Sequence, residues 1–175
     1  MSISSYAAIL ARLGRKKVEY LLIGVSGINF YADGPGSMIA TQDVDILLKP
    51  VTANMLAALK VFEVAGYRLE SNGEPLVGID GWLAERILER RAVVTAVKDG
   101  AFRVDLVTDG GGIPFQEWKK SVRMFEVEGV KVPVGELSQL VQAKHNAARE
   151  KDKKFMSLYK VQIKEMLRAA RKRKS

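Results

Sequence analysis

The sequence predicts a mixed α/β fold with one sheet and a helical C-terminal extension. Three observations carry this prediction: short apolar, strand-like runs alternate with amphipathic segments, glycine-rich turns separate them, and residues 135–175 show only a helical pattern. The 175 residues are 47% hydrophobic and 27% charged, which is the composition of an ordinary globular domain. We therefore expect a single domain over 1–175, with a core over about 18–134 and a helical region over 135–175.

The first half of the chain is expected to alternate helices with two strands. The predicted elements are, in order, a helix over 3–17, a strand over 19–23, a short helix over 25–32 after a tight turn, a loop over 33–37, a strand over 42–48 and a helix over 52–65. Thr52 is the expected N-cap of the last of these helices, and Gly66 is expected to end it.

The second half is expected to form two hairpins and then helices only. We predict a loop over 71–81, a helix over 82–91, strands over 92–97 and 102–107, a helical turn over 114–121, and strands over 123–127 and 130–134. Asp99-Gly100 and Glu128-Gly129 predict the turns of the two hairpins. From Gly135 onward we expect one or two helices with a break near 150–153. Trp82 and Trp118 are expected to be packing residues.

The composition excludes several classes of site. The chain has no cysteine and a single histidine, His145, so thiolate zinc sites, disulfides and cysteine nucleophiles are excluded. Any metal must be held mainly by carboxylates, which favours magnesium or manganese. No apolar run approaches the roughly 20 residues that span a bilayer, and the N-terminus lacks a signal-peptide pattern. We therefore expect a cytoplasmic protein with no membrane partner, and we expect His145 to be a surface helical residue.

Positive charge is concentrated at the C-terminal end. The net charge of the chain is +8, and the segment 144–175 carries +9, which leaves −1 for residues 1–143. This imbalance predicts a phosphate-rich partner such as RNA. A solvated helix face followed by a basic tail is the equally open alternative.

Carboxylates in two strands form the candidate catalytic set. Asp43 and Asp45 lie two residues apart in an apolar strand, so both side chains project to one side and repel each other unless a cation binds. Asp105 lies in a later apolar strand. If that strand lies beside the first, three carboxylates converge, which is the minimum set for two magnesium ions serving phosphoryl or nucleotidyl transfer. The alternatives are a solvent-facing Asp pair and a plain ion pair between Asp105 and Arg103.

The turn before these carboxylates is a candidate phosphate site. Residues 21–27 run from a strand into a helix, and the glycines Gly24 and Gly27 let the backbone approach a ligand. Amides at the start of a helix attract phosphate, and the Ser26 hydroxyl adds a possible hydrogen bond. The alternative is that this turn needs glycine for packing alone.

Together these residues resemble the nucleotidyltransferase superfamily. Its motif is an apolar residue and a glycine (here Gly24) followed by a second Gly or Ser, then Asp-x-Asp on the next strand (Asp43 and Asp45) and a third Asp on a later strand (Asp105). Residues 135–144 (GELSQLVQAK) and 147–152 (AAREKD) are similar to the C-terminal helix of small members related to AbiEii-type abortive-infection toxins. The resemblance implies a nucleotidyltransferase fold, Mg²⁺ or Mn²⁺ as cofactor, and a nucleoside triphosphate as substrate.

The resemblance also implies roles for individual residues. Asp43, Asp45 and Asp105 would be catalytic and would hold the metal, and the nucleotide would contact a second set: Gly24, Ser26, Gly27, Lys144 and Arg149. For Lys144 and Arg149 the alternative is a solvent-exposed helix face, with Arg149 paired to Asp152. Two departures from the family pattern stand out. Val25 occupies the position of the second family glycine or serine, and Lys153 and Lys154 follow where members often carry an acid.

The sequence therefore predicts an enzyme that moves a nucleoside monophosphate from a triphosphate to an acceptor hydroxyl. The acceptor is an RNA end (a transfer RNA among them), a protein or a small molecule, and the family implies a toxin–antitoxin pair with a cognate toxin or antitoxin protein. The alternative is a catalytically inactive module of the same fold that binds RNA or a protein through its basic C-terminal helix.

Overall fold

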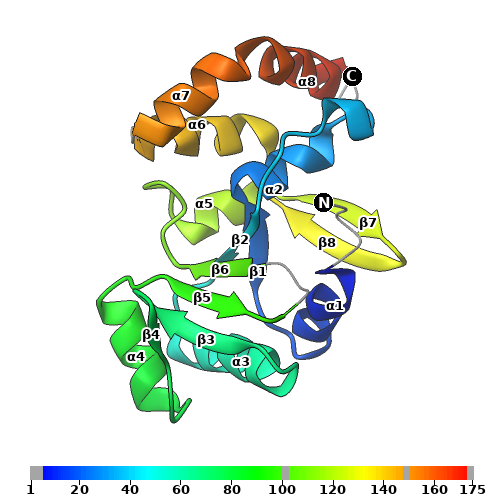
Figure 1. Cartoon of the computed structure of the whole chain (residues 1–175). Helices are drawn as coiled ribbons and strands as arrows, with labels where there is room; N and C mark the ends of the chain where they lie inside the picture. Colours follow the sequence, from blue (N-terminus) through cyan, green and yellow to red (C-terminus); the bar gives the residue numbers. More distant parts are fainter. Residues whose placement is uncertain (1–5, 100–102, 148–149, 173–175) are drawn as a thin grey trace.

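A mixed sheet organises the molecule (Figure 1). The computed structural model describes residues 6–99, 103–147 and 150–172, and this part of the chain forms an eight-stranded sheet in the order β4–β3–β5–β6–β2–β1–β8–β7. The strands are β1 (Tyr20–Ile23), β2 (Asp43–Leu48), β3 (Arg68–Ser71), β4 (Glu74–Pro75), β5 (Val94–Val97), β6 (Arg103–Val107), β7 (Arg123–Val127) and β8 (Val130–Val134). β2 and β6 are parallel, as are β1 and β8, and the other neighbouring pairs are antiparallel. The predicted mixed α/β fold is confirmed.

Helices cover the sheet in two groups. The helical elements are α1 (Ala7–Arg15), α2 (Gly24–Ile28), η2 (Asn29–Tyr31), η3 (Pro35–Ser37), α3 (Thr52–Val64), α4 (Gly81–Glu89), α5 (Phe115–Lys120), α6 (Leu137–Ala147), α7 (Glu150–Leu158) and α8 (Lys160–Lys172). In Figure 1, α1, α3 and α4 lie at the lower end, whereas α6, α7 and α8 stack at the upper end above α2. None of the described helices is both long and apolar enough to cross a membrane.

The pleat of β2 separates the core from the candidate site. Val44 and Ile46 are 2% and 0% exposed and face the packed side of the sheet. Asp43 and Asp45 alternate with them, face the other side and are only partly buried. This alternation follows from the two-residue period of a strand. Asp45 therefore lies between two core residues in the sequence, Val44 and Ile46, but faces the opposite side of the sheet.

Several predicted elements are confirmed and others are corrected. The hairpin turn at Glu128-Gly129 is confirmed, with φ of 49° and 76°. β5 and β6 pair antiparallel as expected, although Gly100 of their connection lies outside the described residues. The expected loop over 71–81 is confirmed for residues 76–80 and wrong before them, because Asn72-Gly73 forms the tight turn of a small β3–β4 hairpin, with φ of 52° and 82°.

Helix ends account for most of the other differences. Thr52 is the first residue of α3 rather than its N-cap, and the capping position, Val51, has no side-chain hydrogen bond. The break expected near 150–153 lies a few residues earlier, because α6 ends at Ala147 and α7 begins at Glu150, with Glu150 and Asp152 placed favourably in its first turn. Trp118 is fully buried as expected, whereas Trp82 is 66% exposed at the start of α4 and is not a packing residue of the core.

Candidate active site

The pairing of β2 with β6 brings the three predicted carboxylates onto neighbouring positions. Asp45 lies opposite Asp105 in the parallel register, and Asp43 lies opposite Arg103. Paired strands are about 4.8 Å apart, and residues two apart share a face, so all three Asp positions lie on one face. The expectation that the strand of Asp105 lies beside the strand of Asp43 and Asp45 is confirmed. The two strands are about 60 residues apart in the sequence.

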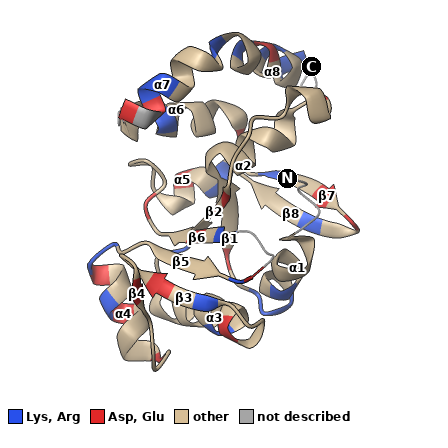
Figure 2. Cartoon of the chain, in the orientation of Figure 1, with Lys and Arg blue, Asp and Glu red and all other residues tan. Residues whose placement is uncertain are grey.

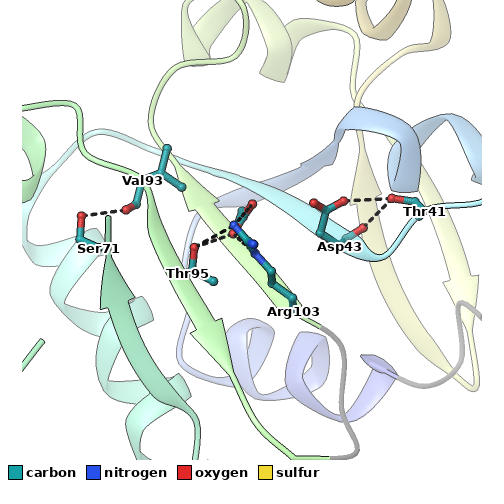
Figure 3. A network of polar contacts seen from close by, with 7 residues as sticks. Thr41, Asp43, Ser71, Val93, Thr95 and Arg103 are labelled. Atoms are coloured by element: carbon teal, nitrogen blue, oxygen red, sulfur yellow. Dashed lines mark hydrogen bonds and ion pairs between the residues drawn. The ribbon is translucent and has the colours of Figure 1, made fainter. Parts of the chain in front are cut away.

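Asp105 is held by two neighbours on the same face. Its Oδ1 accepts hydrogen bonds from Thr95 Oγ1 at 2.8 Å and from Arg103 Nε at 3.1 Å. The Asp105 side chain is 13% exposed and the Arg103 side chain is 56% exposed. The hydrogen bond from Arg103 to Asp105 raises the pKa of the guanidinium, and the charges of Asp43 and Asp45 raise it further. The ion pair considered as an alternative for Asp105 is therefore present. Figure 3 shows Arg103 and Thr95, the two residues that hold Asp105, on neighbouring strands.

Asp43 is oriented by a threonine that precedes the strand. Thr41 Oγ1 donates to Asp43 Oδ1 at 3.0 Å and also lies 3.1 Å from the Asp43 carbonyl oxygen (Figure 3). Threonine makes such short-range contacts readily at the start of a strand. Thr41 was not singled out from the sequence, although a hydroxyl two residues before an acid was a usable signal.

Asp45 lies directly against the Gly24 turn. Gly24 has a φ of +64°, and a Cβ at this position would lie 2.0 Å from Asp45 Oδ2. The turn therefore needs glycine both for its backbone conformation and for the space that the carboxylate occupies. This contact gives a physical reason why a glycine at the end of β1 accompanies an acid on β2.

Ser26 and Gly27 connect the turn to the rest of the fold. Ser26 is 1% exposed, and its Oγ donates to the Ile23 carbonyl at 2.9 Å and accepts from the Asp45 amide at 3.3 Å. A Cβ on Gly27 would lie 3.1 Å from the Leu22 carbonyl oxygen and 3.3 Å from Leu140. These contacts serve packing and strand alignment. Nucleotide contacts by Gly24, Ser26 and Gly27 stay a prediction.

A buried asparagine fixes the loop that leads into β2. Asn29 is 6% exposed, its Nδ2 donates to the Ile39 carbonyl at 2.8 Å, and its Oδ1 accepts from the Ile39 amide at 2.8 Å. Both backbone groups of Ile39 are thereby satisfied by one side chain. Sequence reasoning missed Asn29, because nothing local indicates a partner ten residues away.

Lys144 ties two C-terminal helices together. Its Nζ lies 3.1 Å from Asp152 Oδ1 and 5.0 Å from the ring centroid of Phe155. The side chains of Lys144 and Asp152 are 17% and 2% exposed, so this is not the solvent-exposed lysine of the alternative reading. Arg149 lies outside the described residues, and Asp152, its expected partner, contacts Lys144. His145 is exposed, as expected.

The loop that follows β6 docks on α6. Asn146 Nδ2 donates to the Gly111 carbonyl at 3.0 Å. Gly111 has a φ of +72°, and a Cβ there would lie 2.8 Å from Ala143 Cβ. The strand of Asp105 and the helix of Lys144 are therefore mechanically connected through this loop.

The donor chemistry of the site fits a hard divalent cation. Three carboxylates share one sheet face, where Arg103 pairs with Asp105, and oxygen ligands are those that magnesium and manganese prefer. Over residues 6–99, 103–147 and 150–172, however, no three acidic or histidine side chains are gathered as a ready ligand cluster. The Asp105 carboxylate is turned to Thr95 and Arg103 in this conformation.

Comparisons with known proteins identify the fold. No protein-family model and no curated protein matches the chain. The structure is similar to the crystal structure of an antigenic nucleotidyltransferase-like protein from Paracoccidioides brasiliensis, with a TM-score of 0.53, 15% sequence identity, and coverage of 97% of this chain and 78% of that chain. A likeness at this identity shows the fold alone. The chain therefore has a nucleotidyltransferase-like fold, as the arrangement of Gly24, Asp43, Asp45 and Asp105 implied.

Proposed function

We propose that this chain is a metal-dependent nucleotidyltransferase. The observation that carries the proposal is the β2–β6 register, which sets Asp45 opposite Asp105 with Asp43 two residues away on the same face. Its second support is the Gly24 turn, where the backbone conformation and the missing side chain make room for the Asp45 carboxylate. An acidic face beside a glycine turn is a costly arrangement unless a cation and a phosphate ligand use it.

The proposed reaction transfers a nucleoside monophosphate from a triphosphate to an acceptor hydroxyl. The hydroxyl oxygen attacks the α-phosphorus, a new P–O bond forms, the bond to the bridging oxygen breaks, and pyrophosphate leaves with the electron pair. Asp105 takes the proton of the acceptor. The side chains of Asp43, Asp45 and Asp105 would hold magnesium or manganese, which when bound balances the negative charge that builds up on the phosphates.

Arg103 is the residue that must move for Asp105 to take part. Its guanidinium forms an ion pair with Asp105 in the described conformation. Because the Arg103 side chain is more than half exposed, it can turn to solvent at small cost. We infer that a divalent cation and Arg103 compete for Asp105. Lys144 and Arg149 belong to the proposal as nucleotide contacts, and Lys144 would have to leave Asp152 to make one.

The finer assignments are also part of this proposal. The similarity of residues 135–152 to AbiEii-related members supports placing the chain near them within the superfamily. With that placement we propose a role in a toxin–antitoxin pair with a cognate protein. The acceptor is proposed only as a hydroxyl on RNA, on protein or on a small molecule.

The decisive experiment replaces the two acids of β2. In the double variant Asp43→Asn with Asp45→Asn, we expect magnesium-dependent triphosphate binding, measured by calorimetry, to weaken by more than about 100-fold while the melting temperature is kept. The control is Glu126→Gln with Glu128→Gln, an exposed acid pair of the same spacing on the β7–β8 hairpin. Unchanged triphosphate binding by a folded Asp43→Asn, Asp45→Asn variant would contradict the proposal. Transfer of label from each of the four triphosphates to bulk RNA or protein then tests turnover.

A catalytically inactive module is the second candidate function. It is favoured by the two internal ion pairs, Arg103–Asp105 and Lys144–Asp152, which engage two of the predicted ligands within the chain. This candidate predicts that the wild-type protein binds no magnesium in the millimolar range and transfers no label. Magnesium-dependent triphosphate binding by the wild-type protein would reject it.

A further inference from the structure

Helix α8 carries a row of lysines and arginines on its outer side. Lys160, Lys164, Arg168 and Lys172 are spaced four residues apart, and all four are exposed. Each step of four residues rises about 6 Å along a helix and turns the side chain by about 40°. The four cations, which we call the α8 row, therefore follow one side of the helix. Figure 2 shows basic residues gathered along α7 and α8, at the upper end of the molecule.

The opposite side of α8 is docked on the protein. Ile163 and Met166 are 2% and 4% exposed, and Gln162 Nε2 donates to the Ser37 carbonyl in the segment that leads into β2. The helix is thereby fixed with its cations outward. Since its apolar side is buried, α8 has no continuous apolar face with which to enter a membrane.

The charge of the α8 row is not neutralised within the described part of the chain. Among the residues that the structure describes, no carboxylate forms an ion pair with any of its four members. On α7, by contrast, Lys153 pairs with Glu150 at 2.9 Å. Four like charges on one helix repel each other, and an external polyanion relieves that repulsion.

We propose that the α8 row binds the phosphate backbone of a single-stranded nucleic acid, without preference for its sequence. A single row of cations follows one backbone, and lysine and arginine contacts to phosphates carry no base information. Val161, which is 70% exposed between the cations, adds an apolar contact for a sugar or base. This binding is independent of the proposed transfer reaction, because none of the carboxylates takes part in it.

The test removes the four charges and measures the salt dependence of binding. The probe is a short single-stranded RNA of mixed sequence, followed by fluorescence anisotropy over a series of salt concentrations. In the variant Lys160→Gln, Lys164→Gln, Arg168→Gln, Lys172→Gln we expect weaker binding and a slope of log K against log salt that is smaller by roughly 2 to 3, since each phosphate contact on a single strand contributes about 0.7. Glutamine is a good helix former, so α8 should persist.

The matched control removes four exposed cations elsewhere. Arg12→Gln, Arg15→Gln, Lys16→Gln, Arg90→Gln makes the same charge change at the ends of α1 and α4, and it should leave the slope within about one unit of wild type. An equal slope change in both variants, or none in either, would overturn the proposal, as would tighter binding to anionic vesicles or to duplex than to the single strand. Single-stranded DNA should bind comparably.

The carboxylate variant separates this proposal from the proposed function. Asp43→Asn with Asp45→Asn should lose triphosphate binding and keep binding of the RNA probe. Loss of RNA binding in that folded variant would contradict the α8 row as the binding surface. If the α8 variant loses RNA binding and keeps triphosphate binding, the α8 row is supported as the RNA-binding surface, separately from the proposed transfer site.

Discussion

The two ends of the antiparallel β1–β2 pair differ in their balance of acidic and basic side chains. At the end where β1 begins, Glu19 is paired with two lysines: Lys119 at 2.6 Å and Lys49 at closer range. Asn54 completes this end by accepting from the Glu19 amide and donating to its carbonyl. At the other end, Asp43, Asp45 and Asp105 lie on one sheet face, and Arg103 pairs with Asp105 there. One end has more cations than acids, and the other has more acids than cations.

This difference separates a structural end from the end at which we propose the active site. The Glu19 end needs no external partner, because its charges and its backbone groups are satisfied within the fold. The Asp end gains from any cation that replaces or joins Arg103. The same pair of strands therefore supplies both a fixed anchor and a face on which acids outnumber cations.

The largest expected effect comes from filling the space at the Asp end. Gly24→Ala should lower the free energy of unfolding by about 2 kcal/mol or more, because a left-handed backbone costs an L-residue about 1–2 kcal/mol and the new Cβ meets Asp45. The control is Gly14→Ala in α1, where a Cβ meets nothing and alanine should stabilise the helix by about 0.5–1 kcal/mol. Urea denaturation measures both. If Gly24→Ala changes the free energy of unfolding as little as Gly14→Ala does, the Gly24 turn is not constrained by Asp45.

A moderate effect is expected from changing the charge balance of the Asp end. Arg103→Gln removes the cation that competes for Asp105, and we expect Mn²⁺ affinity without nucleotide, followed by electron paramagnetic resonance, to rise by about fivefold. Arg68→Gln is the matched control, since Arg68 pairs with Glu70 at 2.6 Å two residues along β3. The competition between metal and Arg103 is refuted if both variants bind Mn²⁺ like wild type.

The smallest effect is expected at the Glu19 end, and it should depend on pH. Hydrogen bonds from Lys119 and Lys49 lower the pKa of Glu19, so the folded state favours the ionised form. Its contribution is present above the ordinary pKa of 4.5 and is lost as the pH falls through the lowered value. Glu19→Gln should cost about 1 kcal/mol at neutral pH, with the difference from wild type closing in acid.

The control for Glu19 is Glu63→Gln, which breaks an exposed i,i+3 pair with Lys60. We expect it to change the free energy of unfolding by about 0.3–0.5 kcal/mol. Denaturation curves at neutral and acidic pH separate the two. A Glu19 variant whose deficit persists unchanged in acid would show that the loss comes from packing rather than from charge.

Local patterns in the sequence determined most of the fold. Alternating apolar residues located β2 and β6, and the Glu128-Gly129 turn located the β7–β8 hairpin, because both depend on contacts within a few residues. The small β3–β4 hairpin was missed, although Asn72-Gly73 is itself a strong turn signal. Its strands are too short to show a clear alternation.

The sequence by itself also determined which residues can do chemistry at this site. The absence of cysteine, the single histidine, the Asp-x-Asp strand and the Gly24 turn restricted the candidates to carboxylates beside a glycine turn. The tertiary structure alone decided that β6 lies beside β2 with Asp105 opposite Asp45. It also decided that Thr95 holds Asp105 and that Lys144 holds Asp152. These contacts join segments that pack only when the sheet and the helices assemble, and local periodicity specifies the face of a side chain but not its partner.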